Sequence, residues 1–466
     1  MSLFHDIINN LPEITKPTQK RLPFNEKLKW TGIILVLFYV LGMIPLYGLG
    51  INALQTFQFL SIILGAEFGS IVSLGIGPIV TASIVLQLLV GSKLLKFDLT
   101  TSEGKKTFQG MQKLLSIFFI LFEAAIYVML GGLRPAEGFG SGILIFQLFL
   151  GGMLILFMDE VVSKWGFGSG ISLFIAAGVS KSIFVRFLSP FATSGQLGFP
   201  FGNEPSSGKL WELIYGLTSG SPQMALLAIS AIVATFVVFV AAVYMQAMKV
   251  EIPLSFGRIR GHGIRWPLAF VYTSNIPVIL VAALLANLQL WARLLENWGH
   301  PILGNPATGT GIIGWLNPAF ANSSTAGGII GLIIKQNLTF VTILQSTTYL
   351  LFMVGGAVLF SIFWVQTSGM DARSQAKQMM SSGLQIPGFR RDERVLESLL
   401  NRYIMPLTIM GAISVGFLAA LADLSGALTN GTGLLLTVMI VYRLYEEIAQ
   451  QHMMDMYPVM RRFIKQ

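Results

Sequence analysis

The sequence contains 466 residues, of which 53% are hydrophobic and only 11% are charged, and its mean hydropathy is +0.69. A soluble domain carries roughly 25% charged residues because water wets its surface, so this composition excludes a chain of soluble domains. The sequence has no cysteine, which excludes disulfides and thiolate metal sites.

Ten segments are apolar over a length that could cross a bilayer, for which a helix needs roughly 20 residues. We therefore expect an all-α polytopic membrane protein with ten transmembrane helices. The predicted spans are residues 30–47, 76–95, 107–130, 142–162, 170–189, 223–248, 266–292, 336–365, 402–422 and 432–447.

The positive charges predict how these spans are oriented. With ten spans both termini lie on one side, and 25 of the 31 Lys and Arg residues fall on that side. Positively charged loops stay in the cytoplasm, so we expect both termini to be cytoplasmic. Residues 1–29 are predicted to be a cytoplasmic N-terminus that includes a short amphipathic helix, and residues 448–466 a cytoplasmic tail.

Matching Gly and Pro motifs, five spans apart, predict an internal repeat. The second span opens with Gly75-Ile76-Gly77-Pro78, and the seventh contains Ser274-Asn275-Ile276-Pro277. The fifth span opens with Gly168-Ser169-Gly170, and the tenth with Gly431-Thr432-Gly433. Because five is an odd number, the two repeats would have opposite topology, and interrupted helices at matching places point to the functional site of such proteins.

This repeat divides the chain into a first half, residues 30–189, and a second half, residues 223–447. An external hinge loop, residues 190–222, would join them. The second half carries two basic cytoplasmic loops, at 249–265 and 366–402.

Segment 59–72 is apolar, but it is too short and too interrupted by Gly65, Glu67 and Gly69 to span the membrane. A half-inserted helix is tolerated at membrane depth only where protein or a water-filled cavity surrounds it. Two interpretations stay open at this point: a re-entrant plug that closes a pore, and a re-entrant loop that only packs.

Ionisable residues are scarce inside the predicted spans, where Glu123 stands out. Ion-coupled transporters need such groups to bind or relay the ion. The four histidines fall in loops or termini, without a His-Glu-x-x-His motif or a credible Ser/His/Asp arrangement, so we expect no enzyme activity, no cofactor and no metal site. The aliphatic residues beside the helix breaks could form a constriction that excludes ions by dewetting, or could be ordinary bundle packing.

The motifs at the breaks, together with Phe108-Gln109-Gly110 and Val250-Glu251-Ile252-Pro253, resemble the signature stretches of SecY, the α subunit of the protein-conducting translocon, in its archaeal and eukaryotic branch. The resemblance runs in order from about Leu11 to the C-terminus. It implies a clamshell of two inverted five-helix halves with a re-entrant plug helix. The implied function is the central pore-forming subunit of a protein translocation channel, which passes unfolded secretory polypeptides across the membrane and releases transmembrane segments laterally into lipid. The alternative is an inverted-repeat secondary transporter of a small solute.

The resemblance also assigns roles to individual residues. A ring of six aliphatic side chains would close the pore, namely Ile76, Val80, Ile171, Ile175, Ile279 and Leu436. The plug would include Ile62, Ile63, Leu64, Glu67 and Phe68. A lateral gate between the second and third spans and the seventh and eighth would carry a polar cluster of Thr81, Glu123 and Asn275. Glu123 could instead bond a neighbouring hydroxyl for packing alone.

The partners expected from the resemblance are a SecE subunit, a small single-span β subunit, signal sequences, nascent polypeptides and the lipid of the cell membrane. The basic loops would dock a ribosome, a motor ATPase or both, with Arg258, Arg260, Arg390 and Arg391 near ribosomal RNA phosphates. Positive charge binds phosphate with a strong salt dependence. Cytoplasmic loops are also basic for topology alone, so this role rests on the resemblance.

Overall fold

The computed structural model describes residues 10–19, 22–52, 66–91, 94–95, 97, 101–192, 196–202, 204–256, 263–273, 276–299, 302–304, 311–316, 328–336, 338–381, 384–385, 392–429 and 431–456. The start of the predicted N-terminal helix, residues 59–65 of segment 59–72 and the tips of both basic loops fall outside these residues.

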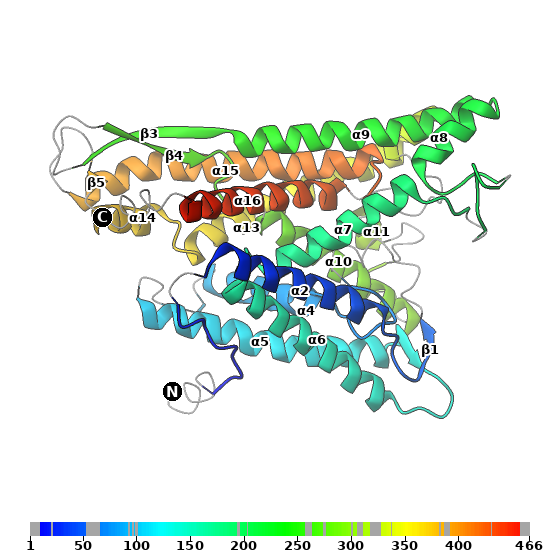
Figure 1. The fold of residues 1–466 in the computed structure, drawn as a ribbon, viewed down its shortest axis with the longest axis horizontal. Helices are drawn as coiled ribbons and strands as arrows, with labels where there is room; N and C mark the ends of the chain where they lie inside the picture. The colour runs from blue at the N-terminus through cyan, green and yellow to red at the C-terminus, as the bar shows by residue number, and fades with distance from the viewer. Residues whose placement is uncertain are drawn as a thin grey trace.

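Ten helices, one at each predicted span, run roughly along the long axis of the molecule (Figure 1). They are α2 (Phe24–Met43), α4 (Gly77–Gly91), α5 (Ser102–Met129), α6 (Ser141–Trp165), α7 (Gly170–Leu188), α9 (Pro222–Ala247), α10 (Ile276–Asn297), α13 (Phe340–Thr367), α15 (Glu393–Ser425) and α16 (Gly431–Met456). Among the described residues, seven helices are long and apolar enough to cross a membrane, and α4 is a shorter apolar helix. The prediction of a helical polytopic bundle is confirmed, and the count of ten crossings fits it.

Local sequence explains several helix starts. The hydroxyl of Thr101 caps α5 by accepting the Gly104 N–H at 3.1 Å. The predicted breaks at Pro78 and Pro277 are helix starts, because each proline is the second residue of its helix. The first N–H groups of a helix have no partner within it, so proline loses nothing there. As a result α10 begins at Ile276, not at residue 266 as predicted.

Residues at the predicted start of the seventh span form a strand instead. β3 (Lys249–Phe256) and β4 (Gly263–Ala269) pair in antiparallel register, and β5 (Leu384–Gln385) pairs with the other edge of β3. The helix prediction was wrong here because Trp266-Pro267-Leu268 is as apolar as the helix that follows. With α14 (Ala372–Ser381), these strands bring both basic loops to one end of the molecule, the hairpin end (left in Figure 1).

Shorter elements cover the opposite end. β1 (Leu49–Asn52) pairs with β2 (Leu133–Pro135), and α8 (Lys209–Thr218) and α11 (Gly311–Leu316) also lie towards this end (Figure 1). α12 (Gly328–Ile334) packs against α9 and α15. The predicted hinge loop 190–222 therefore contains a helix, α8, which packs along α9.

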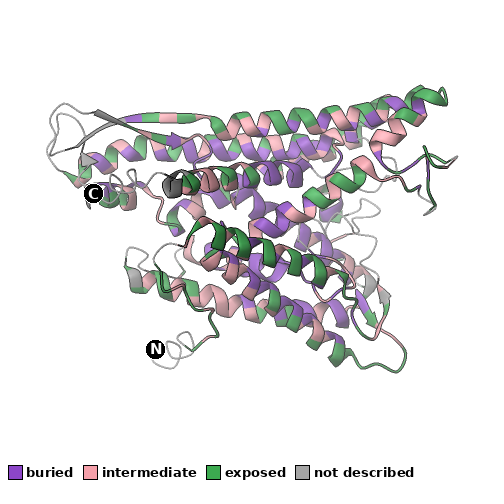
Figure 2. Cartoon of the chain, viewed as in Figure 1, coloured by how far each residue is buried: buried purple, intermediate pink, exposed green. Residues whose placement is uncertain are grey.

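Apolar side chains face outward as well as inward. On α9, small residues such as Ala228 are buried against the bundle, whereas Phe236 is 66% exposed and Val237 is 57% exposed. Exposed residues follow the outer helices and buried residues fill the centre (Figure 2). So large an apolar surface requires lipid around it. The chain is a multi-pass membrane protein.

Both ends of the described chain meet at the hairpin end. Residues 10–16 lie against the end of α6, where Lys164 Nζ is 2.6 Å from Glu13 Oε1 and the indole of Trp165 donates to the backbone at residue 15. Near the other terminus, Gln451 on α16 donates to the carbonyl of Leu22 at 2.9 Å. This placement agrees with an even number of crossings.

Candidate functional site

Three of the six aliphatic residues of the predicted ring, Val80, Ile171 and Ile279, line one cavity. All six lie on or directly before four helices, α4, α7, α10 and α16, and belong to or pack against one buried cluster. Five are between 1% and 6% exposed, and Ile171 is half-buried at the edge of the cluster. Aliphatic side chains offer water and ions no polar contact. The arrangement can therefore act as an apolar constriction.

Helices α4 and α10 supply ring residues in a common register. Val80 follows Pro78 by two residues on α4, and Ile279 follows Pro277 by two residues on α10. Ile76 lies one turn before Val80, and the corresponding position on the second helix is outside the described residues. The matching register is what a structural repeat predicts.

Helices α7 and α16 show the same relation. Each begins at a glycine, Gly170 or Gly431, and its ring residue, Ile175 or Leu436, follows five residues later. The glycine motifs of the sequence align Gly170 with Gly433, whereas the helix starts align Gly170 with Gly431, two residues earlier. In the second half the position one turn earlier is Thr432, which is polar, so α16 contributes fewer aliphatic residues than α7.

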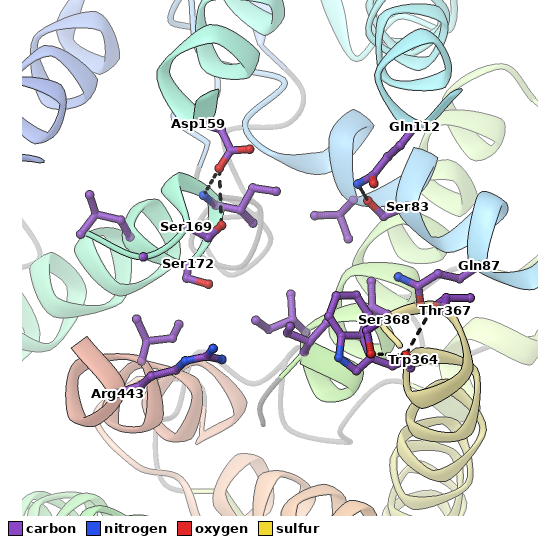
Figure 3. Close-up of a pocket in the computed structure, with 18 of the residues that line it drawn as sticks. Ser83, Gln87, Gln112, Asp159, Ser169, Ser172, Trp364, Thr367, Ser368 and Arg443 are labelled. Atoms are coloured by element: carbon purple, nitrogen blue, oxygen red, sulfur yellow. Dashed lines mark hydrogen bonds between the residues drawn. The ribbon is translucent and has the colours of Figure 1, made fainter. Parts of the chain in front are cut away.

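A cavity of about 640 Å³ lies between helices of both halves (Figure 3). Three of the predicted ring residues, Val80, Ile171 and Ile279, line part of its wall. The rest of the wall mixes apolar side chains, such as Phe108, Leu173 and Ile440, with polar ones. Figure 3 labels Ser83, Gln87, Gln112, Asp159, Ser169, Ser172, Trp364, Thr367, Ser368 and Arg443 around the space. Elements of both halves, from α4 to α16, supply this wall. A wall of mixed polar and apolar side chains can admit an extended chain without selecting one sequence.

Three buried polar side chains connect α5, α4 and α10. Thr81 Oγ1 donates to Glu123 Oε1 at 3.1 Å and accepts from Asn287 Nδ2 at 2.7 Å. Glu123 is only 1% exposed. Because α4 and α5 belong to the predicted first half and α10 to the second, the bond between Asn287 and Thr81 crosses the seam between the halves, and the bond from Thr81 to Glu123 lies within the first half.

Two of the three predicted gate residues, Thr81 and Glu123, are thus in one cluster. The third, Asn275, lies outside the described residues. The amide in the cluster is Asn287, about three turns along α10 from its start. It was not predicted, although an amide in the middle of an apolar span needs a partner on a neighbouring helix, and that requirement is its signal in the sequence.

The described part of the predicted plug, residues 66–72, lies towards the end opposite the hairpin. Glu67 Oε1 is 2.5 Å from Lys181 Nζ on α7, and Phe68 packs against the main buried cluster. The side-chain amide of Asn52 donates to the Phe68 carbonyl at 3.1 Å. The predicted plug residues Ile62, Ile63 and Leu64 lie outside the described residues. The chain runs directly from this turn to Ile76, so the plug segment is joined to the ring.

Two acids that the sequence did not single out bond to the helices that carry ring residues. Asp159 on α6 accepts the Ile171 N–H at 3.0 Å and the Ser169 hydroxyl at 3.4 Å (Figure 3). Asp423 on α15 accepts the Thr432 N–H at 3.0 Å. Both acids lie near the ends of predicted spans, where an acid usually faces water. Each instead satisfies an N–H at the start of α7 or α16.

The predicted docking residues Arg258, Arg260, Arg390 and Arg391 all lie outside the described residues. The elements beside them are described, and Ser255 on β3 pairs with Gln385 on β5. The two basic loops therefore leave the bundle side by side.

A sequence model of the SecY family matches residues 70–445. The chain is 47% identical over 465 residues to the protein translocase subunit SecY of Methanothermobacter thermautotrophicus. The alignment covers 99% of this chain and 98% of that protein. It is also similar to a solved SecY whose plug domain stabilises the closed state of the translocation channel and maintains a membrane seal (TM-score 0.80, 41% identity, 97% of this chain and 98% of that one). Sec61 in the canine ribosome–channel complex from the endoplasmic reticulum is similar as well (TM-score 0.78, 39% identity, 97% and 98%). With a family match over most of its length and a relative of this identity along the whole chain, this protein belongs to the SecY family.

Proposed function

We propose that this chain is the central pore-forming subunit of a protein translocation channel. It passes unfolded secretory polypeptides across the membrane and releases transmembrane segments laterally into lipid; it is a channel subunit, not an enzyme. The observation that carries the proposal is the aliphatic constriction beside the cavity, built by helices of both halves. A solute transporter, the alternative, binds its substrate with charged or polar groups near the midplane. Here the residues at which the four helices meet are aliphatic.

An aliphatic constriction suits a substrate whose sequence varies. When closed, it holds back water and ions by dewetting. When a polypeptide passes, the ring touches it through dispersion contacts, which are individually weak and do not depend on side-chain chemistry. Rigid-body separation of the two halves widens the opening without breaking any helix.

Segment 59–72 serves as the plug in this proposal. The SecY relative with a solved plug domain has that function in its own channel. Support in this chain comes from Glu67, whose ion pair with Lys181 ties the end of the segment to α7. Helix α7 also carries the predicted ring residue Ile175. The plug leaves when a polypeptide enters, and the pair re-forms on closure.

The seam between α4 and α10 serves as the lateral gate, together with α5 and α13. The bond between Asn287 and Thr81 holds the seam shut, and Glu123 accepts from the Thr81 hydroxyl on the first-half side of the seam. A signal helix that lies in the seam favours the open state because it binds that state more tightly than the closed one. Contacts to the signal helix replace the hydrogen bond across the seam, and this exchange raises the population of the open state.

The chain lies in the cell membrane with both termini in the cytoplasm, so the hairpin end is cytoplasmic. A SecE subunit and a single-span β subunit complete the channel.

The basic loops with Arg258, Arg260, Arg390 and Arg391 meet the ribosome, as the canine relative does, and a motor ATPase would use the same surface. Reversing the charges of Arg390 and Arg391 should weaken ribosome binding and flatten its salt dependence. Unaltered binding at physiological salt would remove this docking role.

Reconstitution tests the proposed function. The chain is purified with its SecE and β subunits, placed in proteoliposomes and given ribosomes that carry a secretory nascent polypeptide. Polypeptide protected from added protease, and lost when the signal sequence is deleted from the substrate, is the expected result. Uptake of labelled small solutes without polypeptide protection would instead support the transporter alternative.

A further inference from the structure

Asp423 joins three helices of the second half at the end opposite the hairpin. Its Oδ1 accepts the backbone N–H of Thr432 at 3.0 Å, and its Oδ2 accepts the Thr432 hydroxyl. Oδ2 also accepts the hydroxyl of Tyr349 at 2.6 Å. Tyr349 lies on α13 and Thr432 on α16, and both side chains are buried. One carboxylate therefore holds the second residue of α16 and a hydroxyl of α13.

The backbone at this point leaves α16 almost no freedom to shift. A Cβ on Gly431 would lie 1.9 Å from the carbonyl carbon of Ala422, so the start of α16 touches the backbone of α15 beside Asp423. Hydrogen bonds to a carboxylate are shorter and stronger than neutral ones, and a negative charge is favoured at a helix N-terminus. The start of α16 is thus fixed both by packing and by charge.

The fixed residue stands one turn from the ring. Leu436 follows Thr432 by four residues and lies on the same face of α16. The first half has the same relation, since Asp159 holds the N–H of Ile171 and Ile175 follows four residues later. An arrangement that occurs in both halves at matching places is a property of the repeat, not an accident of one loop. Among the described contacts, the link to a tyrosine of a neighbouring helix is seen at Asp423.

We infer that Asp423 is a positioning residue that sets the place of Leu436 in the aliphatic ring and ties it to α13. The inference rests on the proposed function, because it assumes that the ring closes a pore. Loss of the carboxylate leaves packing alone to hold the first turn of α16, so the turn loosens and Leu436 moves with it. The closed ring then leaks, although Asp423 itself touches neither the ring nor a substrate.

Two readouts on the purified complex test this inference. The first is ion conductance of the closed complex in planar bilayers. The second is the rate at which a membrane-impermeant thiol reagent labels Leu436→Cys, which is specific because the chain has no other cysteine. Asp423→Leu should raise both by about tenfold, the change that follows from losing a hydrogen bond to a charged group. Asp423→Asn keeps an oxygen for the Thr432 N–H and should raise them less.

Thr101→Val is the matched control, since it removes the cap of α5, a helix that carries no ring residue. Its conductance should equal that of the wild type. Leu436→Gly shows the leak expected from the ring itself. If Asp423→Leu stays closed while Leu436→Gly leaks, the inference is wrong and the channel function stands. If Thr101→Val leaks as much as Asp423→Leu, the leak does not depend on the position of Leu436, and the inference is also wrong.

A second variant keeps the test decisive if Asp423→Leu does not assemble. Tyr349→Phe removes the hydroxyl that ties Asp423 to α13 and nearly preserves volume, while Thr432 still donates to the carboxylate, so the complex should fold. Faster labelling of Leu436→Cys in this background supports the inference, and wild-type labelling overturns it. Translocation by the wild-type complex, measured in the same preparation, separates this outcome from failure of the proposed function.

Discussion

The side-chain amide of Asn287 donates to Thr81 Oγ1 at 2.7 Å, and this bond joins two helices whose bonded residues are 206 positions apart in the chain. Both residues are buried. A buried hydrogen bond contributes about 1 kcal/mol to a folded arrangement, and leaving one partner unsatisfied costs roughly 1–3 kcal/mol. This bond is therefore strong enough to keep a seam closed and weak enough for a bound helix to replace it.

Removing the amide should make the gate easier to open. In Asn287→Leu the closed seam loses a hydrogen bond that the open seam does not make, so the open fraction should rise about fivefold for a loss of 1 kcal/mol. Translocation of substrates with weakened signal sequences should increase accordingly. Thr347→Val is the control, because the Thr347 hydroxyl is on the exposed side of α13 and bonds its own helix. Equal translocation of weak-signal substrates by Asn287→Leu and wild type would contradict the gate assignment.

The ion pair of Glu67 with Lys181 should help to retain the plug. Both side chains are about half exposed, and exposed pairs contribute roughly 0.2–1 kcal/mol. Glu67→Lys should therefore raise the frequency of spontaneous channel openings a few-fold in planar bilayers at low salt. The swap Glu67→Lys with Lys181→Glu should restore the wild-type frequency. Openings that remain frequent in the swapped variant would show that this ion pair does not retain the plug.

Residues 10–16 should detach from α6 at low pH. The hydrogen bond from Lys164 holds the pKa of the Glu13 carboxyl below its ordinary value. A lowered folded-state pKa means that the ion pair contributes fully above the ordinary glutamate pKa and is lost as the pH falls through the lowered value. The hydrogen-exchange protection factor of residues 10–16, in which the intrinsic pH dependence of exchange is removed, should fall over that acidic range. In Glu13→Gln the protection factor should be low and constant over the same range; a protection factor that still changes with pH would assign the change to another group.

The apolar spans could be predicted from the sequence because burial in lipid demands long uninterrupted runs. The ring residues were assigned through the resemblance to the SecY family, and in the structure Val80 and Ile279 each stand two residues after a proline near a helix start. The β3–β4 hairpin could not be separated from α10 by hydropathy, because Trp266 and Leu268 extend the apolar run without a polar break. Pro267 and the neighbouring Arg265 were the available signs that a helix does not begin there.

Contacts between distant helices were beyond the sequence. Asn287 is one amide in a long apolar helix, and only packing shows that it faces Thr81. Asp159 and Asp423 stand at span ends, where most acids are solvated, and their role depends on where the next helix turns back. In each case the missing information was the direction of a side chain across a helix interface, which periodicity does not supply.

Ion conductance of ring variants tests the central claim most directly. The complex carrying Ile76→Ser, Val80→Ser and Ile279→Ser is placed in planar bilayers without ribosomes or substrate. A matched variant carries Val233→Ser, Val237→Ser and Val240→Ser on the exposed face of α9. Polar side chains let water wet a constriction, so the ring variant should conduct ions steadily while the wild type and the α9 variant stay closed. A ring variant that remains as closed as the wild type would contradict the claim that these aliphatic side chains seal a pore.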